Sequence, residues 1–200
     1  IKEGTKNFIE AEYSKKHFAD IYPTTTLKLE VLNAQKAKKS GRKMFPGSIT
    51  EFSRGSRLEK NRINVLLMSD SMLLSKKTMD KDDYDQTVFG AYTQPYKALE
   101  ETRPIIIIDE PHRFKRENKA YQCIVDKIQP QCIIRFGATF PNMPKGNEKD
   151  YNNLVYNLGT CEAFNDNLVK GVAVQTLNNV DGEDAKIKLM KVINRPKSCI

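Results

Sequence analysis

The sequence predicts an α/β fold, in which helices cover both faces of a parallel sheet. Short apolar runs suited to strands alternate with longer runs whose apolar residues recur at helical spacing. Strands that alternate with helices pair in parallel through crossover connections. The 200 residues are 39% hydrophobic, which is enough for a core and argues against disorder. Because ligands of such sheets bind beyond the carboxyl ends of the strands, functional residues are expected there.

The first half of the chain contains two predicted strands and one predicted helix. Ser14 to Tyr22 begins with a good N-cap residue and ends before Pro23, which predicts a helix. Leu27 to Leu32 alternates apolar and polar residues, and Ile63 to Met68 is a short apolar run. Both are typical of strands, the second of a buried one. Between them, glycines and serines predict a long mobile loop.

The second half continues the alternation. The pattern from Tyr92 to Glu101 predicts a helix, and Arg103-Pro104 ends it. Ile105 to Ile108 predicts a strand covered on both faces. Helical spacing from Lys115 to Ile128 then precedes a further apolar strand, Gln131 to Phe136.

The last fifty residues are less regular. Tyr151 to Leu158 alternates weakly, and Glu162 to Val169 is helical in pattern. Val172 to Leu177 and Ile187 to Ile193, separated by a turn-rich segment, predict a hairpin. We expect one α/β domain over residues 1–170, and a linker or the start of another domain or insertion over 171–200.

The basic excess is concentrated in one stretch. The chain has 33 Lys and Arg against 25 Asp and Glu, a net charge of +8. From Lys28 to Arg62 there are ten basic residues against three acidic ones, so this stretch carries +7 of the total. A charge run is commonly a solvated connector. The alternative is a surface that contacts nucleic-acid phosphates.

Several classes are disfavoured. No run approaches the roughly 18 apolar residues that a membrane span needs, and there is no signal-peptide pattern. The four cysteines lack C-x-x-C spacing, which disfavours a zinc knuckle or a dithiol redox site. His17 and His112 are the only histidines, so a His-rich metal centre is also disfavoured. A reduced, cytoplasmic protein is expected.

The isoleucine strand leads directly into Asp109-Glu110-Pro111-His112. Adjacent carboxylates at a strand end suit nucleotide hydrolysis, because one can hold Mg²⁺ through water and the other can orient or deprotonate the attacking water. The alternative is a strand end whose Asp caps the next helix. The next strand ends in Gly137-Ala138-Thr139, and this pair of motifs on consecutive strands favours the first interpretation, since it has the spacing of helicase motifs II and III.

These motifs resemble those of superfamily 2 helicases and translocases, and more narrowly those of the restriction (Res) subunit of type III restriction–modification systems. The resemblance extends from Ile1 to about Lys170. It depends on three segments: Ile105 to Phe114 (IIIIDEPHRF), Arg135 to Pro141 (RFGATFP) and Ala163 to Lys170 (AFNDNLVK). Ile1 to Gly4 also resembles the end of the motif Ia region of that family.

The resemblance implies a partial first RecA-like motor lobe that uses ATP and Mg²⁺. Asp109 would hold the Mg²⁺, and Glu110 would position the water. His112 would link the nucleotide to Ala138 and Thr139. The implied partners are double-stranded DNA and a modification (methyltransferase) subunit. DNA contacts are expected at Ser69, Asp70, Ser71, Lys38, Lys39, Arg42 and Lys43.

The phosphate-binding motif G-x-x-x-x-G-K-[ST] does not occur in the sequence. We expect the phosphate loop upstream of Ile1, the arginine fingers downstream of Ile200, and the nuclease centre of an endonuclease outside this chain. The chain alone should bind ATP poorly and should not hydrolyse it. Two alternatives remain open: a motor lobe of another kind, such as a type I restriction subunit or a phage helicase, and a non-catalytic nucleic-acid-binding module.

Overall fold

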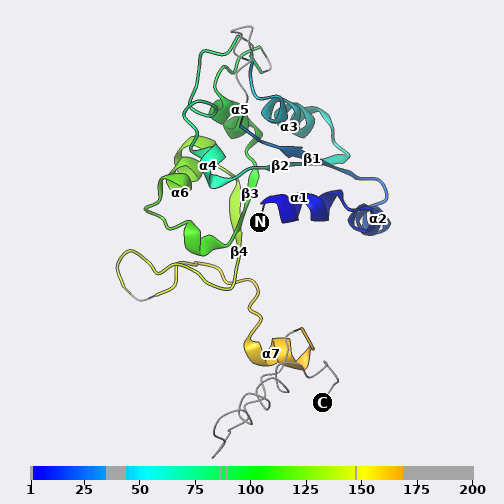
Figure 1. The fold of residues 1–200 in the computed structure, drawn as a ribbon, viewed down its shortest axis with the longest axis vertical. Coiled ribbons are helices and arrows are strands. Elements are labelled where there is room, and N and C mark those ends of the chain that lie inside the picture. The colour runs from blue at the N-terminus through cyan, green and yellow to red at the C-terminus, as the bar shows by residue number, and fades with distance from the viewer. Residues whose placement is uncertain (1, 35–43, 86, 89, 147, 169–200) are drawn as a thin grey trace, which may run out of the picture. The chain divides into compact units, whose positions relative to one another are not determined.

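The computed structural model describes residues 2–34, 44–85, 87–88, 90–146 and 148–168 (Figure 1). The chain divides into two compact units, Ile1–Tyr151 and Asn152–Ile200. The strands identified in the described ranges all belong to the first unit. The predicted domain boundary after residue 170 lies outside those ranges and stays a prediction. Within the described part, no helix has the length and apolar character needed to cross a membrane.

The first strand pair is a parallel β-α-β unit. β1 (Thr26–Val31) pairs with β2 (Arg62–Leu67) so that Thr26 lies opposite Arg62 and Val31 opposite Leu67. α3 (Gly47–Leu58) lies in the connection and packs on both strands (Figure 1). Both predicted strands are confirmed, each displaced by a single residue.

Helix α3 shows that the prediction of a long mobile loop between these strands was wrong. Ile49 and Phe52 are spaced for one helical face, and both are buried. Gly55 continues that face, where a Cβ would lie only 2.3 Å from Oδ1 of Asn64 on β2. Glycine, which had favoured a loop in the sequence, here lets α3 approach β2 closely.

The second strand pair consists of β3 (Ile105–Asp109) and β4 (Cys132–Phe136), which are also parallel. Their connection contains the 3₁₀ turn η1 (Pro111–Arg113), α6 (Lys119–Cys123) and the π-helical turn η2 (Ile124–Ile128). Both strands were predicted. The helix predicted from residue 115 begins four residues later, at Lys119.

The isoleucine strand is covered on one face only in the described structure. Ile108 is buried and Ile106 half-buried, whereas Ile105 and Ile107 are 58% and 65% exposed. The neighbouring strand repeats the pattern, since Phe136 is also 58% exposed. The prediction of cover on both faces is therefore corrected. The sequence could not show this, because four consecutive isoleucines carry no period-2 alternation.

One hydrophobic core serves both strand pairs. α5 (Pro95–Thr102) packs against α3 on one side and η2 on the other. The Ser53 hydroxyl of α3 donates a hydrogen bond to the Ala98 carbonyl at 3.3 Å and is fully buried. Large side chains buried in this core are Leu32, Phe45, Ile49, Phe52, Met79, Val88, Tyr96, Leu99, Ile108, Ile124 and Ile128.

Two helices near the start of the chain lie outside this core. α1 (Lys2–Glu10) and α2 (Glu12–Ile21) contain no buried residues. α1 was not predicted, and α2 confirms the helix predicted from Ser14. Lys2 of α1 donates from Nζ to the Leu32 carbonyl at 2.7 Å, which joins α1 to the end of β1.

In the second unit, α7 (Thr160–Asn165) begins where the Glu162 carboxylate accepts a hydrogen bond from the Gly159 backbone N–H at 3.0 Å. It confirms a helix close to the predicted one. Residues 152–158 form no strand. The predicted hairpin lies outside the described residues.

Candidate active site

The two predicted motifs lie at the same edge of the β3–β4 sheet. Asp109, the last residue of β3, lies opposite Phe136, the last residue of β4. The Glu110 backbone N–H extends this pairing by donating to the Phe136 carbonyl at 3.0 Å. Because the strands are parallel, their carboxyl ends bring Asp109-Glu110 beside Gly137-Ala138-Thr139. The predicted proximity of the two motifs is therefore observed.

Glu110 adopts a left-handed backbone conformation, with φ 56° and ψ 64°. A non-glycine residue pays about 1–3 kcal/mol for such a conformation, which persists where the surroundings fix it and clusters at functional sites. Here it turns the chain from β3 into η1. The turn exposes Asp109 and leaves Glu110 half-exposed at the strand end.

Pro111 and Gly137 hold the two motifs in direct contact. Pro111 is fully buried, and a Cβ on Gly137 would lie 2.4 Å from the Pro111 Cδ. The same Cβ would lie 3.6 Å from the Glu110 Cα. A proline ring cannot rotate away, so only glycine permits this approach. The contact gives a physical reason for the proline in DEPH and the glycine in GAT.

The two carboxylates have different surroundings. Glu110 Oε2 lies 3.0 Å from His112 Nδ1, so these two side chains pair across η1. None of the hydrogen bonds or ion pairs found among the described residues involves the Asp109 side chain, which is exposed. An unpaired carboxylate can take a hydrated cation. The described residues contain no cluster of three or more metal-ligating side chains.

Ser69, Asp70 and Ser71 follow the end of β2. Ser69 caps the short helix α4 (Asp70–Leu73) by accepting from the Met72 N–H at 3.3 Å, and its hydroxyl lies 2.9 Å from that of Ser71. Asp70 Oδ2 lies 3.7 Å from Arg113 Nη2. An exposed pair at this distance contributes little energy. It does bring the predicted DNA-facing segment near the turn that follows Glu110.

The predicted basic contacts lie outside the described residues: Lys38, Lys39, Arg42 and Lys43. Of the remaining basic residues in that stretch, Arg54 and Arg57 project from α3 and are exposed. Lys28 is paired with Glu30 and Glu51, each at 3.2 Å, and the hydrogen bond to Glu30 is the main cause of its raised pKa. Part of the basic stretch is therefore a helix surface rather than a loop.

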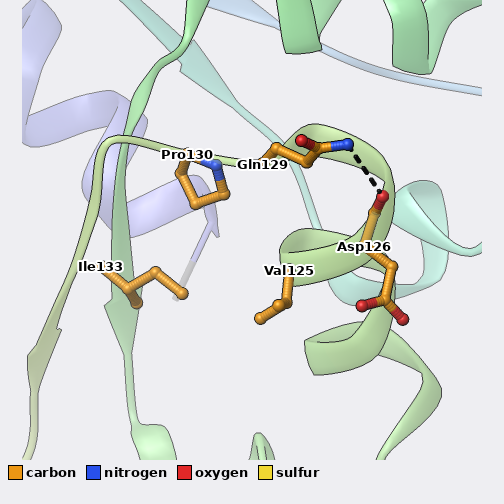
Figure 2. A pocket seen from close by; sticks show the side chains of 5 residues that line it. All are labelled: Val125, Asp126, Gln129, Pro130 and Ile133. Atoms are coloured by element: carbon orange, nitrogen blue, oxygen red, sulfur yellow. Dashed lines mark hydrogen bonds between the residues drawn. The ribbon is translucent and has the colours of Figure 1, made fainter.

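A surface pocket of about 650 Å³ lies beside η2. Figure 2 shows the side chains that line it. Its lining residues are Val125, Asp126, Gln129, Pro130 and Ile133. Two of them belong to η2, two follow it, and Ile133 is the second residue of β4, whereas the motifs lie at the carboxyl ends of the strands. Ligands of parallel α/β sheets bind at the carboxyl ends. We therefore take the motif edge, and not this pocket, as the candidate active site.

An ionic cluster that involves β4 was not predicted from the sequence. Asp150, only 1% exposed, pairs with Arg116 at 2.8 Å and with Arg135 at 3.3 Å. These partners are separated by 34 and 15 positions along the chain. No local pattern brings them together. The only signal in the sequence was the charged Arg135 inside an otherwise apolar strand.

Parallel strands joined through helices, with an Asp-Glu pair at one strand end beside a Gly-Ala-Thr turn at the next, define a RecA-like α/β domain of the helicase class. A family model described as "Type III restriction enzyme, res subunit" matches residues 5–142. The chain belongs to this family, and the resemblance noted in its motifs is confirmed.

Three relatives support the assignment. Over 183 residues the chain is 46% identical to the StyLTI Res subunit of Salmonella typhimurium, covering 87% of this chain and 18% of the relative. Over 174 residues it is 40% identical to the EcoP15I Res subunit of Escherichia coli, covering 86% of this chain and 17% of the relative. It is 38% identical to the EcoPI Res subunit of Escherichia phage P1 over 174 residues. The chain spans less than a fifth of the length of these relatives.

Proposed function

We propose that this chain is part of the ATP-dependent motor of a type III restriction endonuclease subunit, where ATP hydrolysis is coupled to translocation along DNA before cleavage. The observation that carries the proposal is the contact between Pro111 and Gly137. It holds an Asp-Glu pair and a Gly-Ala-Thr turn together at the carboxyl edge of parallel strands, where a phosphate-bearing ligand is expected.

The residues present fit part of a magnesium–nucleotide site. The exposed Asp109 carboxylate would hold Mg²⁺, mainly through water molecules of the ion. When bound, Mg²⁺–ATP supplies the transferable phosphoryl group and an electrophilic centre. Glu110 would orient the attacking water and accept its proton. The pairing of His112 with Glu110 at 3.0 Å fixes the direction of that carboxylate.

We further propose that the Gly137-Ala138-Thr139 turn transmits the state of the nucleotide to the DNA. The turn rests on Pro111, so a shift of the Glu110 turn would move it directly. His112 would take part in this coupling through Glu110. Ser69, Asp70 and Ser71 would contact the DNA backbone, with Asp70 tied to Arg113 of the same turn.

The proposed partners are double-stranded DNA and a modification subunit, because the relatives are Res subunits of type III restriction–modification enzymes. The DNA site would then be read by the modification subunit. Cleavage would use a nuclease centre that we expect outside this chain.

The direct test is Glu110→Gln in the full-length protein that carries this sequence. The amide keeps the size of the carboxylate but cannot accept a proton, so DNA-stimulated ATP hydrolysis should fall by about 100-fold or more. ATP binding should change little. Steady-state ATPase rates and binding of a fluorescent ATP analogue measure the two effects.

Glu117→Gln is the matched control, since Glu117 is an exposed glutamate only a few residues further along the chain. It should leave both quantities unchanged. Near-normal hydrolysis in the Glu110 variant would remove Glu110 from the reaction. Absence of ATP hydrolysis in the wild-type protein with DNA and modification subunit present would favour a non-catalytic nucleic-acid-binding module instead.

A further inference from the structure

Asp150 is a buried carboxylate in a segment without regular structure. Its side chain is 1% exposed, although it lies in the loop that follows the Gly-Ala-Thr turn. An isolated antiparallel bridge between Asn142 and Lys149 folds this loop back on itself. The Asp150 backbone N–H then donates to the Pro141 carbonyl at 2.8 Å. The loop therefore closes at the point where it leaves the turn.

Two arginines bind this carboxylate from different parts of the chain. Arg116 donates from Nε to Oδ1 at 2.8 Å, and Arg135 donates from Nη1 to Oδ2 at 3.3 Å. Arg135 also donates from Nη2 to the Asp150 backbone carbonyl. The hydrogen bond to Asp150 raises the pKa of Arg116 above its usual value. Both carboxylate oxygens are thus occupied by permanent cations.

The positions of the arginines relate this cluster to the candidate active site. Arg135 lies on β4 opposite Ile108, the residue before Asp109, and precedes Gly137 by two positions. Arg116 lies four positions after His112, where the chain has left η1. Asp150 therefore connects β4, which leads into the Gly-Ala-Thr turn, to the segment that follows the Asp-Glu motif and η1.

A cation–π contact also holds the end of the Gly137-Ala138-Thr139 turn. The Arg135 guanidinium lies 5.5 Å from the ring centroid of Phe140, the residue after Thr139. Tyr151 packs edge-on against Phe140 at 5.4 Å between centroids. The Gly137-Ala138-Thr139 turn is thus fixed at its start by Pro111 and at its end by Arg135 and Phe140.

Burial of an ion pair is weak evidence for stability, because desolvation offsets much of the attraction. Its geometry is nevertheless specific, because charge-assisted hydrogen bonds fix the direction of the groups that they join. We propose that Asp150 is a positioning residue for nucleotide hydrolysis, which holds the Gly-Ala-Thr turn in register with Glu110 through Arg135 and Arg116. This inference rests on the proposed function and adds to it a residue outside the two motifs.

The test is Asp150→Asn in the full-length protein. The variant keeps the side-chain size and removes the charge, so the two arginines lose their shared partner. DNA-stimulated kcat for ATP should fall by about tenfold, because displacement of an aligned group is costly. The KM for ATP should stay within about twofold, since a side chain that is 1% exposed would not contact the nucleotide.

Two controls separate positioning from general destabilisation. Ile49→Val removes a buried methyl group remote from the motifs, so it lowers Tm while kcat is retained. Asp80→Asn breaks an exposed ion pair with Lys127 of the same 2.8 Å length and should change neither quantity. Arg116→Gln, at a partly exposed partner, should lower kcat by about threefold, and Arg116→Lys should restore most of it.

The Arg116 series keeps the proposal testable if Asp150→Asn does not fold. A wild-type kcat in Asp150→Asn or in Arg116→Gln, or a kcat loss no greater than that of an equally destabilised Ile49→Val protein, would overturn it. Absence of ATP hydrolysis in the wild-type protein, with DNA and modification subunit present, would instead overturn the proposed function. Normal Asp150→Asn activity alongside an inactive Glu110→Gln protein would remove only the positioning role.

Discussion

At Gly137, the absence of a side chain lets the Gly-Ala-Thr turn lie directly against the Pro111 ring. Gly137→Ala would place a Cβ 2.4 Å from the Pro111 Cδ. Since neither group can rotate away, the strands must shift, and unfolding free energy should fall by about 1–3 kcal/mol. Urea unfolding of the purified protein measures this change. ATPase activity of the full-length protein should fall with it, because the turn moves relative to Glu110.

Gly47→Ala is the matched control for that substitution. A Cβ at Gly47 meets no atom within 4 Å, and the residue lies at the exposed start of α3. Alanine there should be neutral or slightly stabilising, because it restricts the unfolded chain. Equal stability losses at the two glycines would mean that the Pro111 contact does not limit the Gly137 position.

Residues of the candidate active site differ in how far the sequence could place them. The position of Asp109 and Glu110 at the sheet edge was predictable, because they directly follow an apolar run typical of a strand. The left-handed conformation of Glu110 was not predictable, since glycine, asparagine or aspartate usually marks such a position. The partners of Asp150 were hidden for another reason. They are 34 and 15 positions away along the chain and meet only in the folded structure.

At the element scale, α3 provides the clearest difference between sequence and structure. Glycines and serines suggested a loop, yet Ile49 and Phe52 place an apolar face against β1 and β2. Phe52→Ala should therefore lower the unfolding free energy by about 3–5 kcal/mol, because Phe52 is 8% exposed. Thermal or urea unfolding measures the loss.

Arg54→Ala, on the exposed surface of the same helix, should change stability by less than about 0.5 kcal/mol. This contrast is expected only if the segment is a packed helix. A mobile loop in this segment would instead give two small effects.

The isoleucine strand offers a matched pair at the same scale. Ile108 is 4% exposed and packs in the core, whereas Ile107 beside it is 65% exposed. In the 200-residue chain, Ile108→Ala should lower the free energy of unfolding by about 2–5 kcal/mol. Ile107→Ala should lower the free energy of unfolding by less than about 1 kcal/mol, because folding removes little apolar area of this side chain from water. Urea unfolding of both variants tests whether one face of β3 is open; similar losses would show that it is covered.

Across the whole molecule, the alternation of strands and helices was sufficient to predict the α/β class and parallel pairing. The strand ends agreed within a residue because apolar runs such as 63–68 stop where the polar motif residues begin. The separation into two strand pairs was not predictable. Long-range packing, such as that of α5 between α3 and η2, decides which strands become neighbours.

The charge distribution is also a property of the whole molecule, and it leads to a test of DNA binding. Replacing Lys38, Lys39, Arg42 and Lys43 by alanine removes four of the ten basic residues between Lys28 and Arg62. Each lost phosphate contact should reduce the slope of log K against log salt by about 0.9. Affinity should fall about equally for all DNA sequences, because phosphate contacts carry no sequence information.

Fluorescence anisotropy of labelled duplexes at several salt concentrations, with the full-length protein, measures both affinity and slope. The control replaces four exposed lysines elsewhere, Lys15, Lys16, Lys76 and Lys77, and therefore has the same net charge. If DNA binding depended only on the net charge of +8, the two quadruple variants would lower the affinity for DNA equally. A flatter slope in the first variant alone is the expected result, because direct phosphate contacts release counterions at the place of contact. Identical slopes in the wild-type protein and the first variant would leave this stretch as a solvated connector.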